Sequence, residues 1–165
     1  MTDTDTTHEE DLKNLAELIK KARVALLTTV TGSGDLHSRP LAIKEEEFDG
    51  TLWFFTQDPS AKTANIRDNP RVNVSLEAGK GWVSLAGTAT VVRDAAKIDE
   101  LWDTSAEAWF PEGRQDPTVA LIKVDATSAE YWSTNEPAPV TLFKVARAAV
   151  TGGQPDIGES HTVEL

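Results

Sequence analysis

Residues 71–92 read RVNVSLEAGKGWVSLAGTATVV and predict two β-strands joined by a tight turn. The first strand alternates polar residues with the apolar Val72, Val74 and Leu76, which is the two-residue period of a strand that buries one face. Gly79-Lys80-Gly81 forms the turn, and the strand that follows it is unusually long. Strands joined by a short turn run antiparallel, so this stretch favours an antiparallel sheet.

Other strands are predicted on both sides of this hairpin. They cover residues 24–30, 36–47, 51–56, 119–124 and 129–133. The first of them is mostly apolar on both faces, as a strand in the middle of a sheet is. Pro40 interrupts the second, and because proline cannot donate a hydrogen bond to a neighbouring strand, it indicates an edge strand or a bulge.

Helices and tails complete the predicted order. Residues 1–7 are expected to form a disordered lead; Thr7 and Glu10 then have capping-box spacing, and an apolar helical stripe follows. Asp58-Pro59 is typical of a helix start and predicts a short helix to about Asp68. Further helices are expected at 94–102 and 140–150, with an irregular stretch or short helix at 104–116 and an extended polar tail at 152–165.

The order of these elements indicates the fold class. Short strands with tight turns predominate and few β-α-β units are present, which favours an antiparallel barrel over a doubly wound sheet. We predict a mainly β (α+β) chain with flanking helices. The length of 165 residues suits a single domain over residues 1–165, and no internal repeat or linker divides it.

Composition excludes several classes of function. The formal net charge of −11 opposes general nucleic-acid binding, which depends on neutralising phosphates with cations. The chain has no cysteine, so thiolate nucleophiles and cysteine metal sites are excluded, and redox chemistry would need a bound cofactor. No stretch is apolar enough to span a membrane, and residues 1–11 do not resemble a signal peptide, so a cytoplasmic location is expected.

Common catalytic motifs are missing as well. The three histidines, His8, His37 and His161, are far apart, and because strong zinc sites favour His and Cys ligands, we expect no metal site. Gly32-Ser33-Gly34 joins two predicted strands, whereas the hydrolase elbow joins a strand to a helix, so Ser33 is interpreted as a turn residue. The sequence has no Walker A motif and no Rossmann fingerprint.

Two short stretches carry candidate anion-binding residues. Ser60 and Lys62 lie in the first turn of the short predicted helix, where free N–H groups and the helix dipole attract anions. A lysine there opposes the dipole unless an anion such as a phosphate lies between; otherwise Lys62 is an ordinary solvated lysine. Arg39 and Lys44 fall on opposite faces of a regular strand, but a bulge at Pro40 would bring both to one pocket; otherwise both face solvent.

Aromatic residues are the last group of candidates. The chain has five tryptophans, among them Trp82 at the start of a strand, Trp109 in the irregular region and Trp132 on the final strand. Most aromatic residues belong to a core or an interface. As a set, they could also form the wall of a pocket for a flat ring.

Several stretches, in this order, carry a resemblance to a known family. They are SRPL (38–41), LWFFT (52–56), SAK (60–62), NPRV (69–72), WVSLAG (82–87), WFPEG (109–113), AEYW (129–132) and GESHTVEL (158–165). The ordered set resembles the pyridoxamine 5'-phosphate oxidase-like family and, within it, the bacterial general stress protein branch. The resemblance implies a six-stranded antiparallel split β-barrel that binds flavin mononucleotide (FMN) and works as a homodimer with two FMN molecules at the subunit interface.

The resemblance also implies which residues bind FMN. The stretch from Arg39 to Lys44 lines the flavin, and Ser60 and Lys62 match a phosphate-binding Ser-x-Lys segment. Trp132 matches a tryptophan that the partner subunit contributes, and Trp109 is the second candidate for that role. In full, the implied cofactor-binding residues are Arg39, Pro40, Leu41, Lys44, Phe55, Thr56, Ser60, Lys62, Trp82, Ser84, Trp109 and Trp132.

The chain departs from the family's oxidases in three places. Ala61 stands where they carry a second basic residue, so either the lost charge weakens phosphate binding or Arg39 compensates for it. Trp82 stands where they have a glutamine near the flavin ring. The C-terminus lacks the Arg-Leu-His-Asp-Arg-like segment that grips the pyridoxal substrate. We therefore do not expect vitamin B6 oxidation.

The function implied by the resemblance is that of a general stress protein and FMN-dependent oxidoreductase of unknown substrate, with no catalytic acid or base identified. Two alternatives stay open: a stress protein that binds or buffers flavin without turnover, and a reductase whose cofactor is a deazaflavin. Haem is not expected, because it usually needs an axial ligand such as histidine, and only His37 lies in a predicted ordered element.

Overall fold

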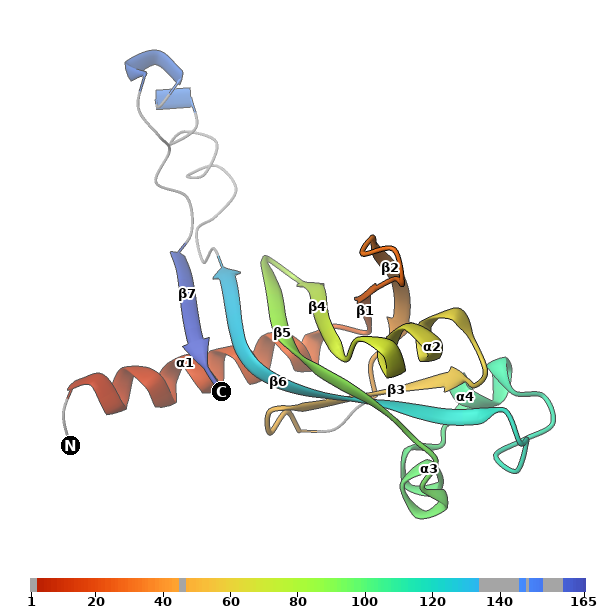
Figure 1. Cartoon of the computed structure of the whole chain (residues 1–165). Helices are drawn as coiled ribbons and strands as arrows, with labels where there is room; N and C mark the ends of the chain where they lie inside the picture. Colours follow the sequence, from red (N-terminus) through yellow and green to blue (C-terminus); the bar gives the residue numbers. More distant parts are fainter. Residues whose placement is uncertain (1–2, 45–46, 134–145, 148, 153–158) are drawn as a thin grey trace.

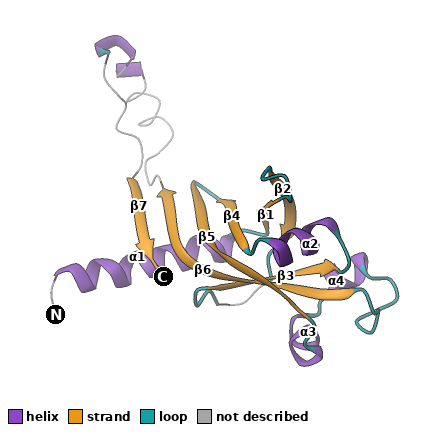
Figure 2. Ribbon diagram, viewed as in Figure 1, coloured by secondary structure: helices purple, strands orange, loops and turns teal. Residues whose placement is uncertain are grey.

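The computed structural model describes residues 3–44, 47–133, 146–147, 149–152 and 159–165. Figure 1 shows a strongly twisted sheet with one long helix along it and shorter helices toward its other end, and Figure 2 separates strands from helices. In chain order the elements are α1 (Asp3–Lys21), β1 (Val24–Val30), β2 (Leu36–Ala42), β3 (Thr51–Gln57), α2 (Ala61–Asp68), β4 (Arg71–Ala78), β5 (Gly81–Val92), α3 (Ala95–Leu101), α4 (Thr104–Trp109), β6 (Val119–Ser133) and β7 (Glu159–Glu164).

The strands form one antiparallel sheet in the order β2-β1-β4-β5-β6-β3, and β7 pairs with β6. Within the described residues no ladder joins β2 to β3, so the sheet stays open between its two end strands, as a split barrel does. The predicted fold class is therefore confirmed, with seven strands where the resemblance implied six. The helix predicted at 140–150 falls mostly outside the described residues.

The largest difference from prediction is β6, which is one continuous strand where the sequence predicted two, at 119–124 and 129–133. Residues 125–128 stay in the strand because they pair with β5, and a register shift between Ala86 and Gly87 absorbs one extra residue. Gly87 permits this close approach: a Cβ there would overlap the carbonyl oxygen of Asp125 and lie 2.9 Å from the Cα of Ala126.

The two ends of the chain are more regular than expected. α1 begins at Asp3, so residues 3–7 of the expected disordered lead are helical. Residues 159–164 of the expected extended tail form β7 against β6. No helix in the described part of the chain is long and apolar enough to cross a membrane.

Two local differences shape the region around β2 and α2. β2 ends at Ala42, and its pairing with β1 runs through Pro40 without a register shift, so Pro40 marks an edge strand and not a bulge. α2 is capped by Ser60 and not by Asp58. The Ser60 hydroxyl accepts a hydrogen bond from the Thr63 N–H, and the Thr63 hydroxyl accepts one from the Ser60 N–H.

Asp58 instead belongs to a buried ion cluster that ties α2 to the rest of the protein. It is only 4% exposed. Arg67 of α2 donates two hydrogen bonds of 2.7 Å to its carboxylate, and Arg93, which follows β5, donates another of 2.8 Å. Hydrogen bonds from Arg67 and then Arg93 hold the pKa of the Asp58 carboxyl well below its usual range, although burial opposes them.

The hydrophobic core lies on the inner face of the sheet. Alternate residues of β1 and β4, such as Leu27 and Val74, are fully buried there, together with Leu15 of α1 and Phe54 of β3. A second cluster packs α3 against the other face of β3 and the start of β6. These two clusters fix β3 from both sides, and the end of β3 enters the candidate site.

Candidate functional site

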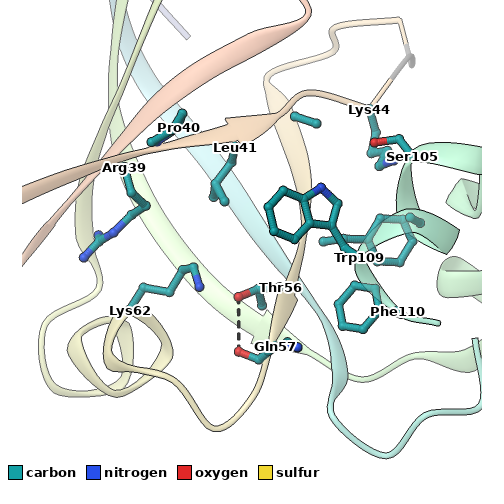
Figure 3. Close-up of a pocket in the computed structure, with 13 residues that line it drawn as sticks. Arg39, Pro40, Leu41, Lys44, Thr56, Gln57, Lys62, Ser105, Trp109 and Phe110 are labelled. Carbon is teal, nitrogen blue, oxygen red and sulfur yellow. Dashed lines mark hydrogen bonds between the residues drawn. The ribbon is translucent and has the colours of Figure 1, made fainter. Parts of the chain in front are cut away.

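A cavity of about 290 Å³ lies between β2, β3, α2 and α4 (Figure 3). Eight of the residues that the resemblance implied for the cofactor site line it: Arg39, Pro40, Leu41, Lys44, Phe55, Thr56, Lys62 and Trp109. The remaining lining residues are Ala42, Gln57, Ser105, Ala106 and Phe110. The fold therefore gathers three segments that are distant in the sequence around one cavity.

Two cations, Arg39 of β2 and Lys62 of α2, form one end of the cavity and lie near each other in Figure 3. Burial lowers the pKa of Lys62, and the positive charge of Arg39 lowers it further. Among the described residues, neither cation has a carboxylate partner, although the protein carries a net charge of −11. This end of the cavity is suited to bind an anion.

Neutral acceptors hold Arg39 in place. Its Nη1 donates a hydrogen bond of 2.6 Å to the Thr29 hydroxyl and one of 3.1 Å to the carbonyl of His37. Asn65 of α2 donates to the same Thr29 hydroxyl at 3.2 Å. Because no acidic side chain neutralises it within the described structure, the guanidinium keeps its charge and further N–H groups for a ligand.

The other end of the cavity is aromatic. Phe55 of β3 packs edge-on against Trp102 and Phe110, with ring centroids 5.5 and 6.4 Å apart. Trp109, the last residue of α4, points into the cavity in Figure 3 and is nevertheless 75% exposed. An apolar surface that is partly open to solvent suits one face of a planar ring.

Lys44 reaches the cavity because β2 ends at Ala42, so strand alternation no longer sets its direction and the predicted bulge is not needed. Its buried ammonium donates hydrogen bonds of 2.8 and 2.9 Å to the two carboxylate oxygens of Asp103. Asp103 also caps α4 by accepting from the Ala106 N–H at 2.8 Å. Burial raises the pKa of Asp103, but these hydrogen bonds outweigh it and lower the pKa overall. Lys44 therefore anchors α4 at the aromatic end.

Four of the implied cofactor-binding residues do not line the cavity of a single chain. The Ser60 hydroxyl caps α2. Trp82 and Trp132 face each other across β5 and β6, and Ser84 accepts a hydrogen bond of 2.9 Å from Asn73. Their binding roles stay predictions.

Two residues that position the site were not found from the sequence. Asp103 had a usable signal, because an aspartate immediately before a short helical segment is a preferred N-cap. Thr29 had none, since it meets Arg39 only through the register of β1 and β2, in which Leu27 pairs with Arg39 and Thr29 with His37. The two side chains are diagonal neighbours across the strands.

The cavity is better suited to binding than to proton transfer by its own side chains. The titratable residues that line it are all cationic: Arg39, Lys44 and Lys62. Of these, Lys44 is ion-paired with Asp103. No carboxylate or histidine is among the described lining residues, so of the common general acids and bases only lysine is present on this wall.

Comparisons with known proteins agree with this architecture. The family model described as pyridoxamine 5'-phosphate oxidase like matches residues 10–156. General stress protein 26 of Bacillus subtilis is 26% identical over 141 residues, which cover 82% of this chain and 98% of the relative.

Solved structures give the same result. The crystal structure of a candidate general stress protein 26 from Jannaschia sp. CCS1 is 27% identical with a TM-score of 0.71, and the match covers 94% of this chain and 99% of the other. The general stress FMN/FAD binding protein from Xanthomonas citri is 29% identical with a TM-score of 0.64, and the match covers 81% of this chain and 92% of the other. This chain is thus similar in sequence and fold to general stress proteins, one of which is named for flavin binding.

Proposed function

Because this chain belongs to the pyridoxamine 5'-phosphate oxidase-like family, as the sequence resemblance predicted, we propose that its cavity binds FMN for a flavin-dependent redox reaction. One observation carries the proposal: two cations without carboxylate partners and an aromatic wall share one cavity within the described structure. The Xanthomonas citri protein, whose name includes FMN and FAD, supports a flavin in general. The lining offers one cationic end, which suits the single phosphate of FMN better than the diphosphate of FAD.

The side chains of the cavity fit the chemistry of FMN. A phosphate monoester would lie between Arg39 and Lys62, and a planar ring would lie toward Phe55 and Trp109. The cavity volume of about 290 Å³ is at the lower end of the range for ligand pockets, roughly 300–1,000 Å³. One chain would therefore enclose only part of the cofactor.

When bound, FMN would supply the electron-transfer chemistry that the side chains lack. The chain's own residues would bind and orient it. Arg39 and Lys62 would hold the phosphate, and Thr56 would lie between the two ends of the cavity. Lys44 and Asp103 would keep α4 in place so that Trp109 shields the ring from water.

A non-catalytic flavin-binding or flavin-buffering role is the second candidate. It is favoured by a specific observation, the lack of a carboxylate or histidine among the described lining residues. The two candidates share the cofactor and differ in turnover. Stoichiometric FMN that no donor or acceptor turns over would favour the buffering role.

Titration with FMN and with riboflavin tests the shared part of both candidates. We expect FMN to bind about 100-fold more tightly than riboflavin, because riboflavin lacks the phosphate and two charge-assisted contacts are worth roughly 3 kcal/mol together. Flavin fluorescence or calorimetry at fixed ionic strength measures both dissociation constants. Equal affinities would contradict the phosphate site. Tight binding of a deazaflavin, without comparable binding of FMN, would identify a deazaflavin as the cofactor.

We further propose that the protein is a homodimer with its cavities at the interface. Away from α3, four apolar residues on the outer face of the sheet are substantially exposed: Val24 53%, Leu26 46%, Trp82 54% and Trp132 39%. The strand register puts Trp82 opposite Trp132 on this face. Large apolar side chains exposed on one face are typical of protein interfaces.

Light scattering at micromolar concentration is expected to give twice the chain mass for the unmodified protein. Introducing charge with Leu26→Glu and Trp82→Glu together should produce a folded monomer, because buried unpaired carboxylates are costly. Ala64→Glu, on the exposed side of α2, is the matched control and should stay dimeric. A monomeric unmodified protein would argue against a shared site.

A further inference from the structure

Thr29 is a fully buried hydroxyl where three elements meet. It lies on the inner face of β1 and is 0% exposed. Its Oγ1 accepts a hydrogen bond of 2.6 Å from Nη1 of Arg39 and one of 3.2 Å from Nδ2 of Asn65. These side-chain contacts are not part of the strand ladders, so they add a separate link from β1 to both β2 and α2.

The two donors to Thr29, Arg39 and Asn65, belong to the proposed anion site or lie next to it. Arg39 is one of its two cations. Asn65 lies three residues after Lys62 on α2, which places the two side chains on neighbouring parts of the same helix face. One oxygen atom of Thr29 therefore connects the β2 cation with the helical turn that carries the other cation.

Charge repulsion opposes this arrangement. The positive charge of Arg39 lowers the pKa of Lys62, which means that the two charged groups disfavour each other at this separation. Both side chains are long, and each would gain solvation and rotamer freedom by turning away. A fixed neutral acceptor between β2 and α2 opposes that movement without cancelling either charge.

We propose that Thr29 is the positioning residue of the phosphate site. By holding Arg39 and Asn65 on one hydroxyl oxygen, it keeps Arg39 and the helical turn of Lys62 together at the cationic end of the cavity. This inference rests on the proposed FMN function and deepens it. It assigns the selectivity for a phosphorylated flavin to a residue that does not itself line the cavity.

A purely structural role would have different consequences. Buried hydroxyls are normally hydrogen-bonded, and many serve only the stability of the fold. Loss of such a hydroxyl would lower stability and weaken every flavin to the same extent. Loss of a positioning hydroxyl would weaken the binding of FMN and leave the binding of riboflavin unchanged, because only FMN has the phosphate. The ratio of the two affinities therefore separates the two roles.

Thr29→Val tests the proposal because it keeps the branched shape and removes the acceptor. We expect the dissociation constant of FMN to rise about tenfold and that of riboflavin to stay the same. Thr29→Ser restores the hydroxyl and should restore the FMN preference. Thr28→Val is the matched control: Thr28 is adjacent, faces the other side of β1 and shares a 2.7 Å hydrogen bond with Ser38.

The outcomes distinguish this inference from the function on which it rests. If the unmodified protein does not prefer FMN to riboflavin, the phosphate site itself is wrong. If it does, and Thr29→Val keeps the full preference or Thr29→Ser fails to restore it, the positioning role is wrong. Should Thr29→Val fail to fold, Asn65→Ala removes only the α2 half of the link. An unchanged FMN-to-riboflavin ratio in that variant would also overturn the proposal.

Discussion

Replacing Arg39 and Lys62 together by alanine is expected to weaken FMN binding about 100-fold, to the level of riboflavin, while the protein stays folded. Both side chains line the cavity and neither has an acidic partner among the described residues, so no ion pair is lost from the fold. The double substitution also removes the repulsion between these two like charges in the ligand-free protein. Parallel titrations with FMN and riboflavin, with thermal unfolding as a check on the fold, measure the effect.

The matched control carries Arg71→Ala and Lys80→Ala. It removes the same pair of residue types and the same charge from exposed positions that do not line the cavity. If this control lost as much FMN affinity, the loss in the cavity variant would reflect long-range electrostatic attraction of FMN and not contact between the two cations and its phosphate. The FMN affinity of the unmodified protein should also fall with added salt, and that dependence should flatten in the double variant. Unchanged FMN affinity would refute the phosphate assignment.

The antiparallel core of the fold was predictable because its signals are local. In 71–92 the alternation of buried and exposed residues and the glycines of the turn both lie in one hairpin, and β4 and β5 pair along it as predicted. The register then follows from the burial of one face, with Val74 and Leu85 opposite each other and both fully buried.

The continuity of β6 was not predictable in this way. Residues 125–128 are too polar to suggest a strand, and only their pairing with β5 and the bulge at Gly87 keep them in one. The start of α2 was wrong for a similar reason. Aspartate is a common helix N-cap, but the carboxylate of Asp58 accepts hydrogen bonds from Arg67 and Arg93. Ser60 caps the helix instead.

In the candidate site, too, the residues on short local motifs were predictable and the residues placed by packing were not. The lining residues that the resemblance implied are carried by short motifs on or next to β2, β3, α2 and α4. Thr29 and Asp103 act through other residues, and their partners are set by cross-strand register and by the packing of α4. Positioning residues of this kind emerge only when the elements are assembled.

Asp58→Asn is expected to lower the free energy of unfolding by about 3 kcal/mol at pH 7 and the Tm by roughly 6–12 °C. The carboxylate is buried and accepts hydrogen bonds from Arg67 and Arg93, and Asn provides neither the charge nor two equivalent acceptor oxygens. The value lies at the low end for a broken buried ion pair because both arginines are about half exposed and can reach water. Thermal and denaturant unfolding measure it.

The same substitution should change how stability depends on pH. The pKa of Asp58 is depressed in the folded state, so its contribution is present above the unfolded-state value of about 3.9 and is lost as pH falls toward the lower folded-state value. The unmodified protein should therefore lose stability below about pH 5. Asp58→Asn should lose less over that range, and the difference between the two proteins should narrow as the solution becomes more acidic.

The effect should also reach the cavity, because the cluster fixes the helix that carries Lys62. Asp68→Asn, at the exposed end of the same helix, is the matched control and should change neither stability nor FMN binding appreciably. In Asp58→Asn, measured at a temperature where it stays folded, FMN should bind a few-fold more weakly while riboflavin binds as before, since only the phosphate contact depends on where α2 lies. A constant gap in stability from pH 7 to pH 3 would show that Asp58 is not the acid-sensitive group. Full FMN affinity in a destabilised variant would show that the ion cluster supports the fold without positioning Lys62.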